Sequence, residues 1–162
     1  MKKYIFRFCS FIIITILTLS LFSCGDSYRN DVKTETIATA IAEKLTLDDG
    51  YSVSDSDSFK YNFNEPSYVD DYTIMYAKSS TNVNRFGVFH VSDSKSVEAM
   101  QQIVEDYVQK YKDNFNYDYL PLENPKIENG KVIVYGNYVV FMFLNEADQS
   151  TADIEILNLL EK

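Results

Sequence analysis

One stretch near the C-terminal end, the apolar run Val139–Leu144, constrains the fold more than any other feature of the chain. A strand with one face in water alternates apolar and polar residues, whereas this run contains no polar residue. It therefore predicts a strand inside a sheet that is covered on both faces. The dipeptide Gly136-Asn137 precedes it and is a strong signal for a two-residue β-hairpin, which would pair Tyr138–Leu144 with Val132–Tyr135.

Two further strands are predicted upstream. Tyr72–Ala77 and Phe86–Val91 are rich in aromatic and β-branched residues, and the polar stretch 78–84 separates them. We expect these two segments to form a second antiparallel pair. Together with the C-terminal hairpin they predict a four-stranded, mainly antiparallel sheet.

Three amphipathic helices are predicted from apolar residues that recur every three or four positions. The first spans Thr34–Leu47, and the last follows residues 145–150. Between the two strand pairs, a long helix begins at a capping residue, Ser92 or Asp93, and continues to Phe115. The apolar faces consist of Ile37, Ala38, Ile41, Ala42 and Leu45 in the first helix, of Val97, Met100, Val104, Tyr107, Val108, Tyr111 and Phe115 in the long helix, and of Ile154, Leu157 and Leu160 in the last.

The other segments are predicted to be irregular. Residues 51–71 are polar with scattered aromatic side chains, which favours a loop with at most one short helical turn. Residues 116–128 contain two prolines, and a following Asn-Gly pair leaves open a short extra strand over residues 126–128. The order α-β-β-α-β-β-α predicts a single α+β domain over residues 34–162, with helices packed on the sheet.

The N-terminal residues 1–23 resemble a bacterial lipoprotein signal peptide. Basic residues precede an uncharged, largely apolar run over residues 8–22, which is shorter than the roughly 20 residues of a membrane-spanning helix. The run ends in Leu-Phe-Ser-Cys at residues 21–24, a sequence that resembles the lipobox. This motif implies cleavage after Ser23 and attachment of diacylglycerol to the thiol of Cys24. A retained transmembrane helix and an ordinary secretory signal are the alternatives.

The charge of the chain indicates how it meets the membrane. Residues 24–33 are a polar tether, with a span of roughly 15–18 Å as a flexible coil. Three of the 15 basic residues and none of the 24 acidic ones lie in the leader, so the remaining chain has a formal charge of −12. Such a charge opposes binding to nucleic acid or to anionic lipid head groups. We therefore expect attachment through the lipid, at the outer face of the cell membrane, and an envelope protein or glycan as partner.

Aromatic residues cluster where the long helix ends. The chain has 13 tyrosines and no tryptophan, and Tyr111, Phe115, Tyr117 and Tyr119 lie close together in the sequence. Aromatic rings stack on sugars and anchor protein partners, so these four residues are the predicted binding surface. Packing of the same rings into the core is the alternative.

The only histidine, His90, restricts the catalytic hypotheses. Ser92 and Asp93 follow it, but no motif typical of a nucleophile surrounds any serine. A zinc site needs three or four ligands that the chain lacks. Asp55 and Asp57 alternate as in a calcium loop, but the glycine and glutamate of an EF-hand do not follow. We therefore expect no catalytic residue, metal or cofactor.

The whole arrangement resembles a family of small lipoproteins from Gram-positive, clostridial-type bacteria that carry a domain of unknown function. The resemblance extends over residues 34–160 and implies the fold and the location at the outer face of the cytoplasmic membrane, but no activity. It also implies an acidic residue at the start of the second strand, where this chain has Arg85. The resemblance depends on residues 37–45, residues 71–76, Val88-Phe89 and Gly136–Val140.

These observations predict a non-enzymatic accessory or binding module at the cell envelope. A small envelope hydrolase that uses His90 is the alternative function. The sequence leaves the ligand and the oligomeric state open.

The lipid anchor is testable by metabolic labelling with palmitate. The wild-type chain is expected to incorporate label and to lose residues 1–23, because the thiol of Cys24 accepts the lipid before cleavage. The variant Cys24→Ser is expected to remain unlabelled and unprocessed in the same cells. Recovery of a labelled Cys24→Ser chain, or of a wild-type chain with its leader intact, would contradict the assignment.

Overall fold

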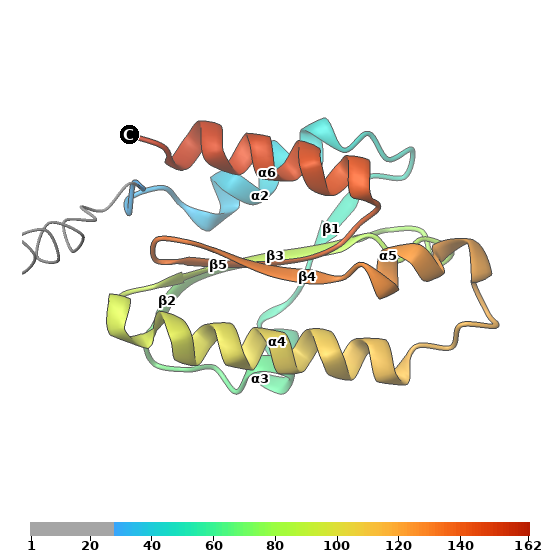
Figure 1. Cartoon of the computed structure of the whole chain (residues 1–162), viewed down its shortest axis with the longest axis horizontal. Helices are drawn as coiled ribbons and strands as arrows, with labels where there is room; N and C mark the ends of the chain where they lie inside the picture. Colours follow the sequence, from blue (N-terminus) through green and yellow to red (C-terminus); the bar gives the residue numbers. More distant parts are fainter. Residues whose placement is uncertain (1–27) are drawn as a thin grey trace, which may run out of the picture.

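The computed structural model describes residues 28–162, and it shows three layers with a central β-sheet between two layers of helices (Figure 1). The predicted cleavage and lipidation residues, Ser23 and Cys24, lie outside the described part. The predicted α+β class is confirmed, and so is the packing of helices on an antiparallel sheet.

The sheet has five strands in residues 28–162, not the four that were predicted. Each strand runs antiparallel to its neighbours, in the order β1-β2-β3-β5-β4. The additional strand, β1, is three residues long and lies at the edge beside β2. The strands are β1 Tyr51–Val53, β2 Val69–Ala77, β3 Arg85–Val91, β4 Lys131–Tyr135 and β5 Tyr138–Phe143.

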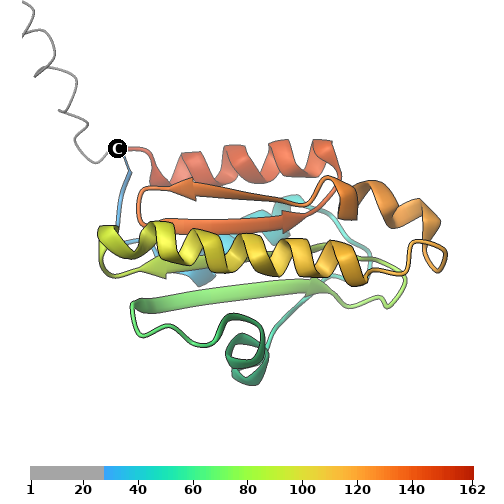
Figure 2. The ribbon, with the colours of Figure 1, turned by 60° about the horizontal axis from the view of Figure 1, so that its bottom comes forward.

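The helices are divided between the two faces of this sheet. Helices α2 and α6 cover one face, and α4 runs along the other with α3 near the β2 side (Figures 1 and 2). Within residues 28–162, no helix is both long and apolar enough to cross a membrane. The helices are α2 Thr34–Lys44, α3 Ser56–Phe63, α4 Val97–Asn114, α5 Asn124–Glu128 and α6 Glu146–Leu160, with 3-10 turns at Ser94–Ser96 and Pro121–Glu123.

Strand β5 holds the two halves of the core together, as its unbroken apolar sequence predicted. All of its side chains are buried, and it lies between β3 and β4. Tyr138, Val140 and Met142 face the α2–α6 layer, whereas the alternate residues face α3 and α4. Because every second side chain changes face, both faces need apolar residues. At Gly87 of β3, an added Cβ would collide with the ring of Phe141, so glycine gives this ring its room.

The predicted loop over residues 51–71 contains β1 and α3. Helix α3 is capped by Asp55, whose carboxylate accepts a hydrogen bond from the Ser58 N–H at 2.8 Å. Its apolar contacts come from Phe59 and Phe63, which are one turn apart and both buried. A helix held by two residues has too short an apolar stripe to be distinguished from a loop by periodicity.

Residues 124–128 form the short helix α5, so the alternative of an extra strand over residues 126–128 is wrong. Pro125 stands in the first turn of α5, where a missing N–H costs nothing. The long helix α4 ends where it was predicted to end, but it begins at Val97, later than a cap at Ser92 or Asp93 implies, because a 3-10 turn over Ser94–Ser96 precedes it. The side chain of Asp93 accepts a hydrogen bond from the Lys95 N–H in the 3-10 turn that leads into α4, and Phe115 is the C-terminal capping residue.

Residues 28–33 lie against the domain and do not form the free coil that was expected of the tether. The Tyr138 hydroxyl accepts a hydrogen bond from the Val32 N–H at 3.0 Å and donates one to the Val32 carbonyl at 2.8 Å. The ring of Tyr28 packs edge-on against Tyr135, and the Arg29 N–H donates to the Leu160 carbonyl. The flexible-coil estimate therefore does not apply to this part of the segment.

Removal of one hydroxyl should release this segment. Tyr138→Phe is expected to lower the free energy of unfolding by about 1–3 kcal/mol, because both backbone groups of Val32 lose a partner. It should also increase hydrogen exchange of the Val32 amide. Tyr61→Phe is the matched control, since Tyr61 is 80% exposed; urea unfolding of both variants measures the difference. Equal stabilities would contradict this role of Tyr138.

Candidate binding site

The candidate site lies around Arg85, the first residue of β3. His90 is near the other end of the same strand, beside the N-terminal segment. Five residue steps along a strand separate the two by about 17 Å. Arg85 and the docked N-terminal segment are therefore at opposite ends of the sheet.

The Arg85 side chain extends toward α4 and contacts two tyrosines. Its Nη1 donates a hydrogen bond to the Tyr107 hydroxyl at 2.9 Å, and its guanidinium carbon lies 4.9 Å from the centre of the Tyr111 ring. Both tyrosines belong to α4 and are one helical turn apart. The guanidinium is thereby fixed on two sides by aromatic residues.

The charge of Arg85 has no acidic partner within residues 28–162. No carboxylate oxygen of these residues is within 4.0 Å of the guanidinium. Burial raises the pKa of Tyr107, and the nearby Arg85 only partly offsets this effect, so the phenol is neutral at pH 7. Arginine stays protonated at any such pH. A charge with little access to water normally has an ionic partner, so this one is open to an anionic group.

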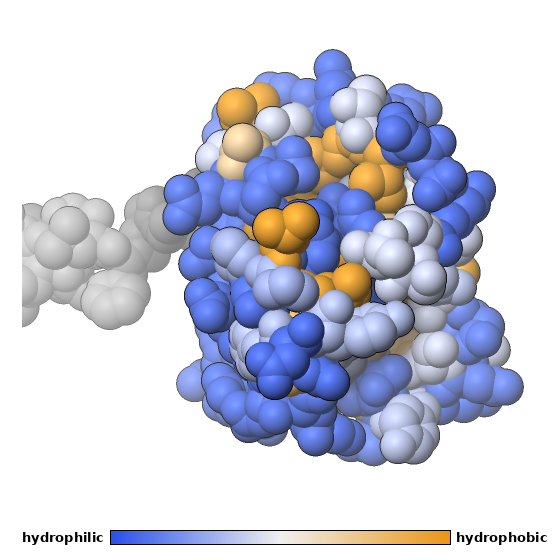
Figure 3. Space-filling view, turned by 90° about the vertical axis from the view of Figure 1, so that its right-hand side faces the viewer, coloured by the Kyte–Doolittle hydropathy of each residue, from blue (hydrophilic) through white to orange (hydrophobic). Residues whose placement is uncertain are grey.

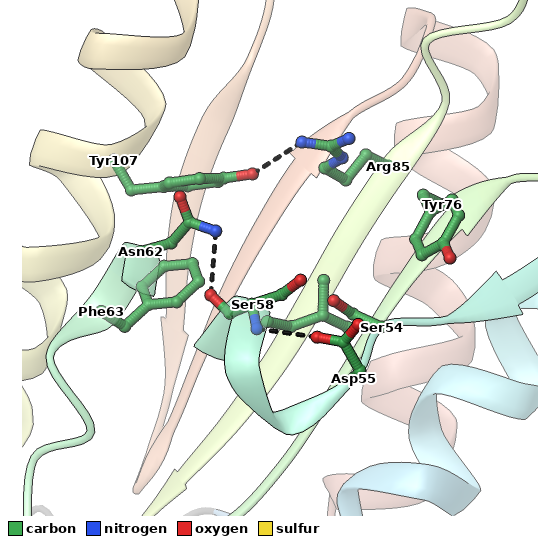
Figure 4. Close-up of a pocket in the computed structure, with 9 residues that line it drawn as sticks. Ser54, Asp55, Ser58, Asn62, Phe63, Tyr76, Arg85 and Tyr107 are labelled. Carbon is green, nitrogen blue, oxygen red and sulfur yellow. Dashed lines mark hydrogen bonds between the residues drawn. The ribbon is translucent and has the colours of Figure 1, made fainter. Parts of the chain in front are cut away.

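Arg85 borders a cavity of about 260 Å³ between β2, β3, α3 and α4, which we call the Arg85 pocket (Figure 4). Asp55 also lines it and supplies the opposite charge. Hydrogen bonds from the backbone and side chain of Ser58 hold the pKa of Asp55 below its usual value, so this carboxylate is ionised. Apart from these two charges and the aliphatic Ile74, the walls are polar and aromatic, from Ser54, Ser58, Asn62, Phe63, Tyr76 and Tyr107.

A second cavity of about 310 Å³, the aromatic hollow, adjoins the pocket and shares Arg85 and Tyr76 with it. Three of the four residues of the predicted binding surface line this hollow: Tyr111, Phe115 and Tyr119. Figure 3 shows this end of the molecule, where hydrophobic side chains gather around a depression among hydrophilic ones.

The four aromatic residues of the predicted surface are not equivalent. Tyr119 is 70% exposed. Tyr111 and Phe115 are partly buried against the core, and Tyr117 packs edge-on against Phe115 with ring centres 5.2 Å apart. Tyr117 is not among the residues that line the hollow. Both predicted roles, packing into the core and forming an exposed surface, therefore occur within this one cluster.

His90 contacts residues that are distant in the sequence, not Ser92 and Asp93. Its Nδ1 is 2.5 Å from the Asp70 Oδ1, and its Nε2 is 2.8 Å from the Asn30 Oδ1. Ser92 donates its hydroxyl hydrogen bond to the Tyr68 carbonyl. A separate small cavity lies beside His90, and none of its lining residues within the described part of the chain is a serine. A Ser-His-Asp arrangement is therefore not formed from these neighbours.

The acidic residues that suggested a calcium loop serve a local purpose. Asp55 caps α3, and Asp57 is in the first turn of that helix, where a negative charge is favourable. Between residues 28 and 162, no group of three or more His, Cys, Asp or Glu side chains is arranged to hold a metal ion.

In the sequence, Arg85 stands out only as a departure from a family pattern. Its importance comes from the register, because Arg85 pairs with Tyr76 of β2 and faces the tyrosines of α4. An arginine directly before the uncharged run Phe86–Phe89 was the available signal. Ser54, Ser58 and Asn62 carried no such signal, because they belong to a segment that was expected to be a loop.

Comparison with known proteins identifies the family. The profile of the family described as "Domain of unknown function (DUF4358)" matches residues 43–144. This match covers more than half of the chain, so the chain belongs to this family, and the predicted membership of a family of unknown function is confirmed. No curated protein and no solved structure matches the chain. The matched range includes all five strands and the lining of both cavities, but not α6.

An unpaired charge should contribute little to stability. Arg85→Met is expected to change the free energy of unfolding by less than about 1 kcal/mol or to raise it, since an apolar group of similar size replaces an uncompensated charge. The Tyr107 hydroxyl borders the open pocket and can bond to water instead.

Lys126→Met is the control for this prediction. The Lys126 ammonium is 2.8 Å from the Glu123 carboxylate, and both side chains are only 15% exposed. Removal of the Lys126 ammonium leaves the Glu123 carboxylate without its ionic partner and should lower the free energy of unfolding by about 3 kcal/mol. Urea unfolding measures the free energy of unfolding of both variants. If Arg85→Met lowers this free energy as much as Lys126→Met does, Arg85 stabilises the fold and the prediction is wrong.

Proposed function

We propose that this protein is a lipid-anchored extracytoplasmic lipoprotein of Gram-positive, clostridial-type bacteria that acts as a non-enzymatic binding module at the outer face of the cell membrane. The leader and the lipobox-like residues 21–24 support the anchor. The formal charge of −12 in the remaining chain supports attachment by lipid and not by surface charge.

The observation that carries the binding function is the pair of adjoining cavities around Arg85. A ligand site is concave, has apolar and aromatic walls and contains a few polar groups that fix orientation. The aromatic hollow has such walls. The adjoining Arg85 pocket is more polar, and it supplies the orienting groups, among them a cation without an acidic partner in residues 28–162. Envelope proteins and glycans, which both interact with aromatic rings, are the proposed partners.

The docked N-terminal segment supports an orientation for this module. Only four residue steps separate Cys24 from Tyr28, so the chain between them spans at most about 14 Å. The His90 end of the sheet would then lie at the membrane. The Arg85 end would point away from it, toward components of the cell envelope.

A hydrolase that uses His90 is the second candidate, because His90 and Asp70 form a pair like that of a catalytic base and its orienting acid. Its Nε2, which would face a nucleophile, instead meets Asn30. We therefore favour the binding module. His90→Ala separates the two: a hydrolase loses turnover, whereas a binding module keeps its partner.

Crosslinking in intact cells tests the module. A photo-crosslinking amino acid at Tyr119, which is 70% exposed beside the aromatic hollow, is expected to trap a discrete partner. The control position is Ile154, which is 58% exposed on α6 across the sheet. The product should form at Tyr119 alone and persist in the His90→Ala background. Identical products at both positions, or none at Tyr119, would exclude this binding surface.

A further inference from the structure

We propose that the Arg85 pocket binds a small zwitterion of the α-amino-acid type, with the ligand carboxylate on Arg85 and the ligand ammonium group toward Asp55. This inference rests on the proposed function as a binding module and names its ligand class. It follows from the two opposite charges in one cavity, from the size of the cavity and from the groups between the charges.

The carboxylate end is assigned to Arg85. The guanidinium has five N–H donors in a planar fork. Within residues 28–162 it makes one hydrogen bond, from Nη1 to the Tyr107 hydroxyl. The remaining donors match a carboxylate, which arginine binds through two parallel hydrogen bonds. Because Tyr107 and Tyr111 hold the guanidinium in place, little side-chain entropy is lost on binding.

The ammonium end is assigned to Asp55, at the rim of the pocket on the α3 side. One oxygen of Asp55 accepts the Ser58 N–H, and the carboxylate is ionised. It is not within ion-pair distance of Arg85. The two charges therefore do not neutralise each other, and a ligand that carries both charges can meet each of them.

The pocket selects against other anions. It has a single cation and also a carboxylate, so a phosphate dianion would gain one attraction and meet one repulsion of similar size. The formal charge of −9 on the whole chain adds to this repulsion. The volume of about 260 Å³ is below the range of about 300–1,000 Å³ for drug-sized ligands, and it suits a molecule of amino-acid size. Tyr76, which is 38% exposed, offers its ring to the side chain of the ligand.

Isothermal titration calorimetry of the full chain in detergent tests this assignment. The probes are glycine, L-alanine and L-phenylalanine, with acetate, ethylammonium and inorganic phosphate as ions of a single sign. At least one amino acid should bind saturably. Acetate and ethylammonium should bind at least about tenfold more weakly, because each loses one charge-assisted contact. Phosphate should not bind.

Matched variants test the two charges separately. Arg85→Gln should weaken binding of the amino acid by roughly tenfold to a hundredfold, as expected for a lost hydrogen bond to a charged group. Asp55→Asn should weaken it by about threefold to tenfold, because Asp55 is exposed to solvent. Asparagine caps helices as well as aspartate does, so α3 is preserved. Asp93→Asn, at the cap before α4, and Arg29→Gln, at an exposed ion pair, are the controls and should bind like the wild type.

The assignment is overturned if no amino acid binds, if acetate binds as tightly as the best amino acid, or if Asp55→Asn and Asp93→Asn bind alike. These outcomes differ from a failure of the binding module. A discrete crosslink at Tyr119 without amino-acid binding refutes the zwitterion and leaves the module. Absence of both refutes the two proposals together.

Discussion

Strand β5 is buried on both faces, and the rest of the structure depends on the need to cover it. Tyr138, Val140 and Met142 require the α2–α6 layer, and Phe141 and Phe143 require α4. Residues 28–162 contain no cysteine, so no disulfide within them supports the core. Burial of apolar surface on both sides of one strand is thus the main source of stability.

Arg85 is an exception to this stabilisation by apolar packing. A cation beside Tyr107 and Tyr111 that has no carboxylate of residues 28–162 within 4.0 Å does not stabilise the fold as a paired charge would. Groups that contradict the rules of stability are concentrated at functional sites. The same physical reason connects the pocket, the aromatic hollow and the proposed ligand: the site offers a charge that the domain itself does not satisfy.

The long regular elements could be predicted from the sequence, and the short ones could not. Helix α4 and the hairpin of β4 and β5 have several periodic apolar residues or a specific turn signal. Strand β1 has three residues, and it exists because the free edge of β2 accepts its backbone hydrogen bonds. Helix α3 has only two buried residues, Phe59 and Phe63. Its partner surface, which includes Phe89 and Tyr107, is assembled from other segments.

The sequence by itself determined the acidic charge, the two-sided burial of β5 and the amphipathic face of α4, and it predicts the leader with its lipobox-like end. These properties are local, because each depends on residue types at short spacing. Only the tertiary structure decided that Arg85 meets Tyr107, that His90 pairs with Asp70 and not Ser92, and that residues 28–33 lie against Tyr138. Contacts between distant segments depend on strand register and helix placement, which the packing of the whole core fixes.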